Sequence, residues 1–266
     1  MTIRRSQSPY LRSSMSDERS DEQTAPDTVS SEMSFMEHLS ELRIRLFRSV
    51  LGLLIACIIV AFWREELMTY VLLRPALDAK VELMNTEPFG QAFLYFKVIF
   101  FGGLVLSFPW LMYQLWSFVA PGLYHHERRW ARAISLLTTI CFVIGLAFGY
   151  YVLIPSMMSY IDTVGNANIK DIISVTSYFS FFINMMLASG FIFELPMVTW
   201  VLARFGMVTA AFLNKYRRHA IVIILILAAV ITPTPDPLTQ LMVAVPLYVL
   251  FEISIVIAKF SAPKPR

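Results

Sequence analysis

Six long runs of apolar residues follow one another along the chain, separated by shorter polar segments. They lie at Leu46–Phe62, Ala92–Phe118, Ala133–Ile161, Tyr178–Ala203, Ala220–Thr232 and Leu238–Ala258. A helix that crosses the hydrocarbon core of a bilayer needs about 20 residues. The second, third, fourth and sixth runs reach that length, and an amphipathic segment extends the first. The pattern predicts an all-α membrane protein with six transmembrane helices.

The fifth run is the shortest of the six. It has 13 residues between His219 and Pro233, which corresponds to roughly 20 Å of helix. A helix of that length either thins the bilayer locally or is sheltered by its neighbours. We therefore expect helices five and six to form a short pair. The alternative is a re-entrant hairpin made by the same two runs.

Prolines lie inside four of the runs, and each removes one backbone hydrogen bond and tends to kink its helix. They are Pro109, Pro155, Pro196 and Pro246. Kinks in the second, fourth and sixth runs would give a kinked and curved bundle. Gly145 and Gly149 in the third run offer a flat face for close contact with another helix.

The composition agrees with a membrane protein. Apolar residues make up 57% of the 266 residues and charged residues 15%, against ~25% charged residues in a typical soluble domain. This excludes a soluble enzyme domain, a disordered regulator and a nucleic-acid-binding protein. Residues 1–31 predict a disordered tail, residues 32–260 the membrane domain and residues 261–266 a short C-terminal tail. Cys57 and Cys141 lie in apolar runs, where packing is their expected role.

Lysines and arginines are distributed unevenly over the two sides of the expected helices. Of the 22, 17 lie before the first run, in the second and fourth loops, or after the sixth run. Four lie in the opposite loops, and Lys97 lies inside the second run. Cytoplasmic loops carry an excess of these residues. We therefore expect both termini in the cytoplasm.

An acidic residue lies near arginines before the first run. The segment before the first run is expected to begin a helix at Ser34, where Ser34 and Glu37 match a capping box. Glu41, one turn later, has no such structural role. Its simplest role is an ion pair with Arg45 at the i,i+4 spacing, and the alternative is that it binds a ligand.

A second acidic residue, Glu127, lies in the second loop. It follows the turn residues Pro121 and Gly122 and is surrounded by three arginines and two histidines. An ion pair with a neighbouring arginine is its simplest role. A metal site with His125 and His126 is a weak alternative, because adjacent histidines on a helix point in different directions.

Ionisable residues inside the hydrocarbon region are costly and are usually functional. Glu194 lies well inside the fourth run, and its structural alternative is a protonated acid hydrogen-bonded within the bundle. Asp236 belongs to the outer turn between the fifth and sixth runs. Thr232 and Gln240 flank that turn and are placed to hydrogen-bond a helix from another chain.

Five motifs carry more specific information. They are His38-Leu39-x-Glu41-Leu42-Arg43-x-Arg45-Leu46; Pro109-x-x-x-Tyr113-Gln114-x-Trp116-x-Phe118-x-x-Pro121-Gly122-Leu123-Tyr124-x-x-Glu127-Arg128-Arg129; Gly145-x-x-Phe148-x-Tyr150 with Pro155; Gly190-x-x-Phe193-Glu194-x-Pro196; and Thr232-Pro233-x-x-Asp236-x-x-x-Gln240. In this order they closely resemble the TatC family, the multi-spanning subunit of the twin-arginine protein translocase. The resemblance runs from about Ser34 to Phe260.

The resemblance implies a receptor for twin-arginine signal peptides at the cytoplasmic face. By motif, Glu41 and Glu127 would bind the two arginine side chains, Arg43 would help to orient the first site, and Phe118 would pack beside it. A guanidinium pairs with a carboxylate through two parallel hydrogen bonds, which lysine cannot reproduce. Glu194 would contact a partner's transmembrane helix or the inserted signal.

The resemblance also implies partners and a location. Thr232 and Gln240 would help to dock single-span subunits of the TatA and TatB type, and the chain would self-associate in the receptor complex. It would lie in the bacterial inner membrane and export folded proteins by using the proton motive force. Neither a cofactor, a metal nor a nucleic acid is implied.

Two other classes of function compete with the translocase. A proton-coupled transporter using Glu194 would need paired broken helices in two halves, and the sequence shows one buried acid without such a pair. A membrane enzyme would use His125, His126 and Glu127. The sequence contains no G-x-x-x-x-G-K-[ST] phosphate loop, so the chain is not expected to hydrolyse nucleotide itself.

Overall fold

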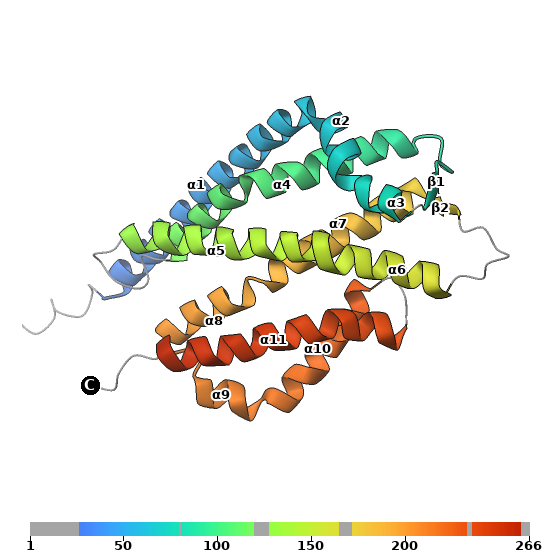
Figure 1. Cartoon of the computed structure of the whole chain (residues 1–266). Helices are drawn as coiled ribbons and strands as arrows, with labels where there is room; N and C mark the ends of the chain where they lie inside the picture. Colours follow the sequence, from blue (N-terminus) through green and yellow to red (C-terminus); the bar gives the residue numbers. More distant parts are fainter. Residues whose placement is uncertain (1–26, 80, 120–127, 165–171, 233–235, 262–266) are drawn as a thin grey trace, which may run out of the picture. The chain divides into compact units, whose positions relative to one another are not determined.

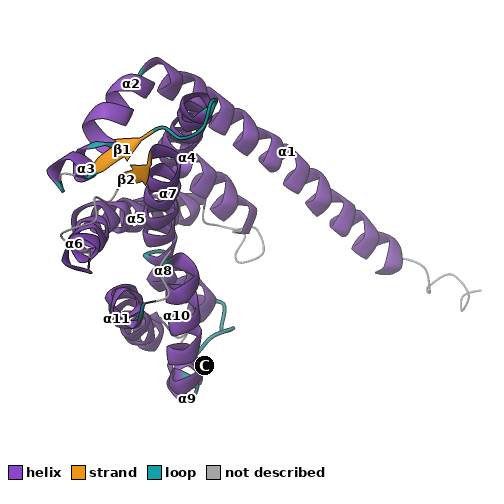
Figure 2. Cartoon of the chain, turned by 90° about the vertical axis from the view of Figure 1, so that its right-hand side faces the viewer, coloured by secondary structure: helices purple, strands orange, loops and turns teal. Residues whose placement is uncertain are grey.

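A computed structural model of the chain describes residues 27–79, 81–119, 128–164, 172–232 and 236–261 (Figure 1). The chain divides into two compact units, Met1–Leu46 and Phe47–Arg266. In the described parts, the structure is helical apart from two three-residue strands (Figure 2).

Helix α1 spans Asp27–Phe62 and therefore begins earlier than expected. The sequence has no proline or glycine between Asp27 and Gly52 to stop a helix, and the carboxylate of Asp27 is favourable at a helix N-terminus. The prediction that the helix begins at Ser34 is wrong. The last residues of the expected tail, from Asp27 to Ser31, are helical.

Five helical segments are long and apolar enough to cross a membrane. They are Leu39–Phe62, Gly90–Val119, Arg132–Ser159, Val175–Arg204 and Pro237–Ser261, and they match the first, second, third, fourth and sixth apolar runs. The fifth run forms α10, Arg217–Ile231, whose 15 residues make roughly 22 Å of helix. Helix α10 is therefore short, as expected.

The expectation that the sixth helix is also short is wrong. Helix α11 spans Pro237–Ser261 and has 25 residues, with Pro246 inside it. A proline removes one helical hydrogen bond but does not end a helix that is held on both sides by packing. Helix α4, Gly90–Val119, continues past Pro109 in the same way.

The third and fourth apolar runs each form more than one helical segment. The third consists of α5, Arg128–Phe148, a π-helical turn η3, Gly149–Leu153, and α6, Ile154–Val164. The π turn lies directly before Pro155, where the wider spacing of hydrogen bonds accommodates a residue without an N–H. The fourth run is divided into α7, Val175–Ile192, and α8, Leu195–Arg204.

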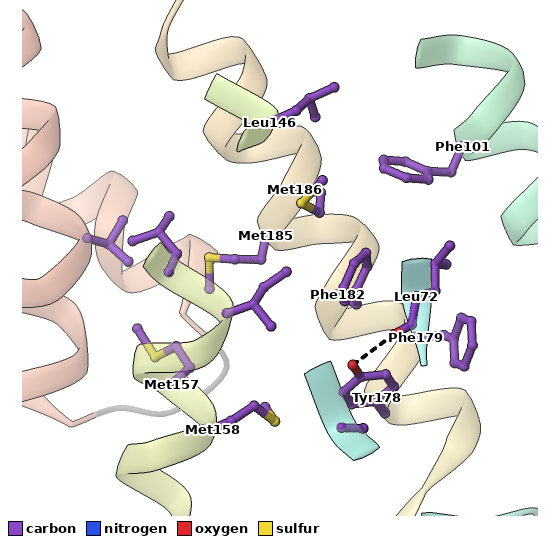
Figure 3. Packing of buried hydrophobic residues seen from close by; sticks show 14 of the residues in the cluster. Leu72, Phe101, Leu146, Met157, Met158, Tyr178, Phe179, Phe182, Met185 and Met186 are labelled. Carbon is purple, nitrogen blue, oxygen red and sulfur yellow. Dashed lines mark hydrogen bonds between the residues drawn. The ribbon is translucent and has the colours of Figure 1, made fainter. Parts of the chain in front are cut away.

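The segment between α1 and α4 folds over one end of the helices. It contains α2, Arg64–Glu66, the π turn η1, Leu67–Leu72, α3, Arg74–Asp78, and strand β1, Glu82–Met84. Strand β1 pairs in parallel with β2, Ile172–Ser174. The hydroxyl of buried Tyr178 in α7 donates to the carbonyl oxygen of Leu72 over 2.9 Å (Figure 3). This segment is thus held by the backbone pairing of β1 with β2 and by the Tyr178 side chain of α7.

Helix α5 lies in the middle of the second unit, against α4 on one side and α7 on another (Figure 1). Phe108 of α4 and Phe142 of α5 stack with ring centroids 3.6 Å apart. The core is built from large apolar side chains, among them Leu72, Phe101, Leu146, Phe179, Phe182 and Met185 (Figure 3). Helix α11 packs against α8 and α10, and α9, Ala210–Lys215, precedes α10.

Candidate functional site

Glu41 lies on α1 and forms an ion pair within the same helix. Arg45 donates from Nε and Nη2 to Oε1 of Glu41, over 2.9 Å and 2.5 Å. The side chains of Arg45 and Glu41 are 21% and 35% exposed. The i,i+4 pair expected from the sequence is therefore present. It also keeps the Glu41 carboxylate at the surface of α1 in contact with a guanidinium.

The other residues expected at the signal-peptide site are placed only in part. Arg43 is exposed on α1, and Phe118 is half-buried in the last turn of α4. Glu127 lies outside the described residues, as do the turn residues Pro121 and Gly122. Of the residues expected at this site, Glu41, Arg43 and Phe118 are thus among those that the structure describes.

The end of α4 that carries Phe118 packs on α8 through aromatic side chains. Trp116 is 8% exposed and contacts a small cluster with Val201 at its centre. Its indole Nε1 has no hydrogen-bond partner in the part of the chain that the structure describes. A buried indole N–H normally finds a partner, so this donor is an exception among the described residues.

Glu194 lies at the junction of α7 and α8. The helix turns at Phe193 and Glu194, and Pro196 follows at the start of α8, where its missing N–H breaks the ladder. The Glu194 side chain is 8% exposed. Its Oε1 atom has no hydrogen-bond partner among the described residues. The sequence analysis gave a hydrogen bond within the bundle as the structural alternative for Glu194. The described residues provide no such bond for Oε1.

Close packing holds the backbone around Glu194 in place. A Cβ atom on Gly145 of α5 would lie 2.7 Å from the carbonyl oxygen of Ser189 and 2.9 Å from the Cα of Gly190. The hydroxyl of Ser189 donates to the carbonyl oxygen of Gly145 over 2.5 Å. The expectation that Gly145 and Gly149 form a helix-packing face is confirmed, since both lie against Ser189 of α7.

The described residues on either side of residues 233–235 form local hydrogen bonds. The hydroxyl of buried Thr232 donates to the Ala228 carbonyl over 2.9 Å. Asp236 caps α11 by accepting from the N–H groups of Leu238 and Thr239, both over 3.0 Å. These bonds stabilise the end of α10 and the start of α11.

Gln240 connects the two helices that follow and precede residues 233–235. Its side-chain nitrogen donates to the carbonyl oxygen of Leu225 in α10 over 2.8 Å. Closer to the far end of α11, Glu252 accepts from Arg217 over 2.7 Å and from Tyr248 over 2.8 Å. Polar contacts therefore join α10 and α11 at two places, one near the start of α11 and one at the start of α10.

Comparisons of the sequence and the fold with known proteins identify the family of the chain. Residues 37–246 match the sequence model of the family described as Sec-independent protein translocase protein (TatC). The chain belongs to the TatC family. The matched range begins before Glu41 and includes Glu194 and Gln240, so the family's sequence pattern covers each of the elements described above. The family is one of translocase components, which are transport proteins.

Two curated relatives illustrate the sequence similarity. The TatC protein of Deinococcus radiodurans is 36% identical over 240 residues, with 88% of each chain covered. TatCy of Bacillus subtilis is 35% identical over 240 residues, which cover 88% of this chain and 92% of the relative. Both are named Sec-independent protein translocase proteins.

Two solved structures have the same fold. A crystal structure of the twin-arginine translocase receptor TatC superimposes with a TM-score of 0.75 at 32% identity, covering 84% of this chain and 99% of that one. A second crystal structure of TatC, in the detergent DDM, gives a TM-score of 0.76 at 33% identity with the same coverage. The described helices are thus arranged as in the TatC fold.

The sequence did not single out two residues that shape these sites. The first is Ser189, whose hydroxyl donates to the Gly145 carbonyl. The small residues Ser189 and Gly190 in the fourth run could have indicated a close contact with Gly145 and Gly149 in the third. Trp116 was noticed only as part of a motif. A buried tryptophan next to the end of an apolar run, with a second one at Trp200, would have indicated the aromatic cluster.

Proposed function

We propose that the chain is the signal-peptide receptor of a twin-arginine translocation system. It binds the paired arginines of the signal peptide at its cytoplasmic face and, with single-span partner subunits, exports folded proteins by using the proton motive force. Membership of the TatC family supports the translocase role. The receptor role is supported by one structural observation: the Glu41 carboxylate accepts two hydrogen bonds from the Arg45 guanidinium.

The chemistry of Glu41 suits an incoming arginine. Both bonds from Arg45 go to one oxygen, Oε1, and the carboxylate is 35% exposed. An i,i+4 ion pair stabilises a helix by only ~0.3–0.5 kcal/mol. A signal-peptide arginine with full bidentate geometry therefore competes with Arg45 at little energetic cost. Glu127 would bind the second arginine, with Arg43 and Phe118 beside the site.

Glu194 is proposed to act after the signal peptide has bound. It lies inside a membrane span, is 8% exposed and leaves Oε1 without a partner among the described residues. A polar atom in that state has a large free energy to gain from a hydrogen bond. A donor on a partner's transmembrane helix or on the inserted signal peptide would supply it.

Partner subunits are proposed to dock on α10 and α11. Gln240 donates to a carbonyl of α10 and so helps to hold the two helices together, whereas Thr232 donates to the Ala228 carbonyl at the end of α10 itself. The outward faces of the helices carry large exposed apolar side chains, which are Val222, Ile226 and Val230 on α10 and Leu241, Val245, Val249 and Val256 on α11. Such a surface fits an apolar single-span helix or lipid.

The proposed topology has six spans, with both termini in the cytoplasm of a bacterial cell and the chain in the inner membrane. Helix α10 is the fifth of these spans in chain order, and its roughly 22 Å is shorter than a hydrocarbon core of ~30 Å. The exposed residues Arg217 and Arg218 lie at its first turn and Lys259 near the end of α11, which agrees with the positive-inside rule.

Photocrosslinking in membranes tests the receptor role. A signal peptide with Arg-Arg is expected to crosslink near Glu41 and Glu127, and the same peptide with Lys-Lys is expected to lose most of this crosslinking. Glu41→Gln and Glu127→Gln should each weaken the Arg-Arg product. Glu65→Gln is the matched control, because Glu65 is an exposed glutamate on α2 outside the proposed site. Equal crosslinking of the two peptides would refute the proposal.

A further inference from the structure

An open groove of about 890 Å³ lies between the α2–α3 segment and the second half of the third span. Tyr70, Arg74 and Asp78 line it on one side, and Val143, Tyr151 and Met186 are among the residues on the other. Helix α3 lies against α6 here (Figure 1). The groove falls in the usual size range of ligand sites, and none of the motif residues discussed above takes part in it except Tyr150 and Pro155.

The charged side chains among the lining residues are one cation and one anion on the same short helix. Arg74 Nε and Asp78 Oδ2 are 3.9 Å apart, and the two side chains are 66% and 74% exposed. A pair at that distance and exposure contributes little to stability. The two side chains can therefore separate, so that Arg74 pairs with a negative charge on a bound molecule and Asp78 with a positive one.

The floor of the groove is apolar and continues along α5. Val143, Leu146 and Ala147 belong to it, and Leu136 and Ile140 extend the same helix face with 64% and 46% exposure. From Leu136 to Ala147 the face is ~16 Å long at 1.5 Å per residue. A strip of this kind matches a hydrocarbon chain that lies along the helix and enters the groove at one end.

The lining residues are expected to reach from within a membrane span to the interface between hydrocarbon and water. Arg74 and Asp78 belong to the segment between two spans, whereas Val143 lies within the span Arg132–Ser159. Tyr70 and Tyr151 border the groove and are 69% and 74% exposed. Exposed tyrosines are typical of this interface, because the ring prefers the apolar side and the hydroxyl the wet one.

We propose that this groove binds a phospholipid whose head group carries both a phosphate and a primary ammonium, as phosphatidylethanolamine does. The Arg74 guanidinium donates to the phosphate, the Asp78 carboxylate accepts from the ammonium, and an acyl chain lies along the α5 face. An anionic head group without an ammonium would leave the Asp78 carboxylate beside a like charge. A quaternary ammonium has no N–H group and so could not donate a hydrogen bond to the Asp78 carboxylate.

Lipid titration of the purified full-length chain in detergent tests the proposal. Phosphatidylethanolamine is expected to bind about tenfold more tightly than phosphatidylglycerol or phosphatidylcholine, measured by native mass spectrometry and by the rise in Tm. Arg74→Gln should weaken all three lipids, and Asp78→Asn should bring the ratio of phosphatidylethanolamine to phosphatidylglycerol close to one. Arg64→Gln and Glu65→Gln, exposed on α2 and absent from the groove lining, are the matched controls and should leave the ratio unchanged.

Three results would overturn the proposal. The first is equal binding of the three lipids, and the second is an unchanged lipid ratio in the Asp78 variant. The third comes from a photoreactive residue placed at Val143 in native membranes, where crosslinks to a protein rather than to lipid would assign the groove to a peptide. If Asp78→Asn fails to fold, Arg74→Lys replaces it. This variant keeps the charge but loses the planar fork, and it should weaken binding of all three lipids while keeping their order.

Discussion

The side-chain nitrogen of Gln240 in α11 donates a hydrogen bond to the carbonyl oxygen of Leu225 in α10 over 2.8 Å. The two residues come from opposite sides of the outer turn, and α10 is too short to span a typical hydrocarbon core alone. The position of α10 therefore depends on contacts with α11. A side chain that the sequence suggested for binding another chain has a structural role within its own.

Replacing Gln240 tests that role. Gln240→Leu is expected to lower the stability of the purified chain by ~0.6–2 kcal/mol, the range for an interhelical hydrogen bond in membranes. The measurement is thermal unfolding in detergent. Gln91→Leu, at an exposed position in the first turn of α4, is the control. Equal Tm values for the two variants would show that the Gln240 bond contributes nothing.

Gly145 is expected to tolerate no added methyl group. In Gly145→Ala the new Cβ would lie 2.7 Å from a backbone oxygen and 2.9 Å from a backbone Cα of α7, and backbone atoms cannot move aside locally. Overpacking of this kind costs ~1–3 kcal/mol. Thermal unfolding should show a clear loss of stability.

Gly149→Ala provides the matched comparison for Gly145. Its Cβ would meet side-chain atoms of Ser189 and Met186 at 3.0–3.4 Å, which are able to adjust by a few tenths of an ångström. A smaller loss in Tm than for Gly145→Ala is expected. The reverse order would mean that the α5 and α7 contact is not as close at Gly145 as described.

Glu194 is expected to show opposite effects on stability and on transport. Glu194→Leu removes a buried oxygen that has no hydrogen-bond partner among the described residues, so thermal stability should stay the same or rise. Export of a folded reporter should fall strongly, while crosslinking of the signal peptide is retained. Glu194→Gln keeps the shape and a polar group and should retain more export. Loss of peptide crosslinking in Glu194→Leu would contradict an action after binding.

Removal of residues 1–31 is expected to leave export intact. The truncated helix α1 would begin at Glu32, a good residue for a helix N-terminus, and would retain the Glu41–Arg45 pair. Removal of residues 1–26 is the control, because it leaves the whole of α1 in place. If only the longer deletion abolished export, the first turn of α1 would have a function of its own.

Much of the architecture could be read from local pattern. The apolar runs located the helices because a span must be continuously apolar, and the charge asymmetry gave an orientation for them. Pro196 indicated the break between α7 and α8, since proline removes a local backbone bond. The extent of α1 and the length of α11 were misjudged, because a capping box or a proline marks a place where a helix can end but not whether it does.

The sequence by itself determined which residues are apolar, where helices can form and that the chain resembles the TatC family. Only the tertiary structure decided which polar groups find partners on other helices: Gln240 with Leu225, and Glu194 Oε1 with none among the described residues. It also brought Arg74 and Asp78 to one groove with Val143. The reason is physical, since helix formation depends on neighbours in the chain, whereas burial and hydrogen bonding between helices depend on residues far apart in sequence.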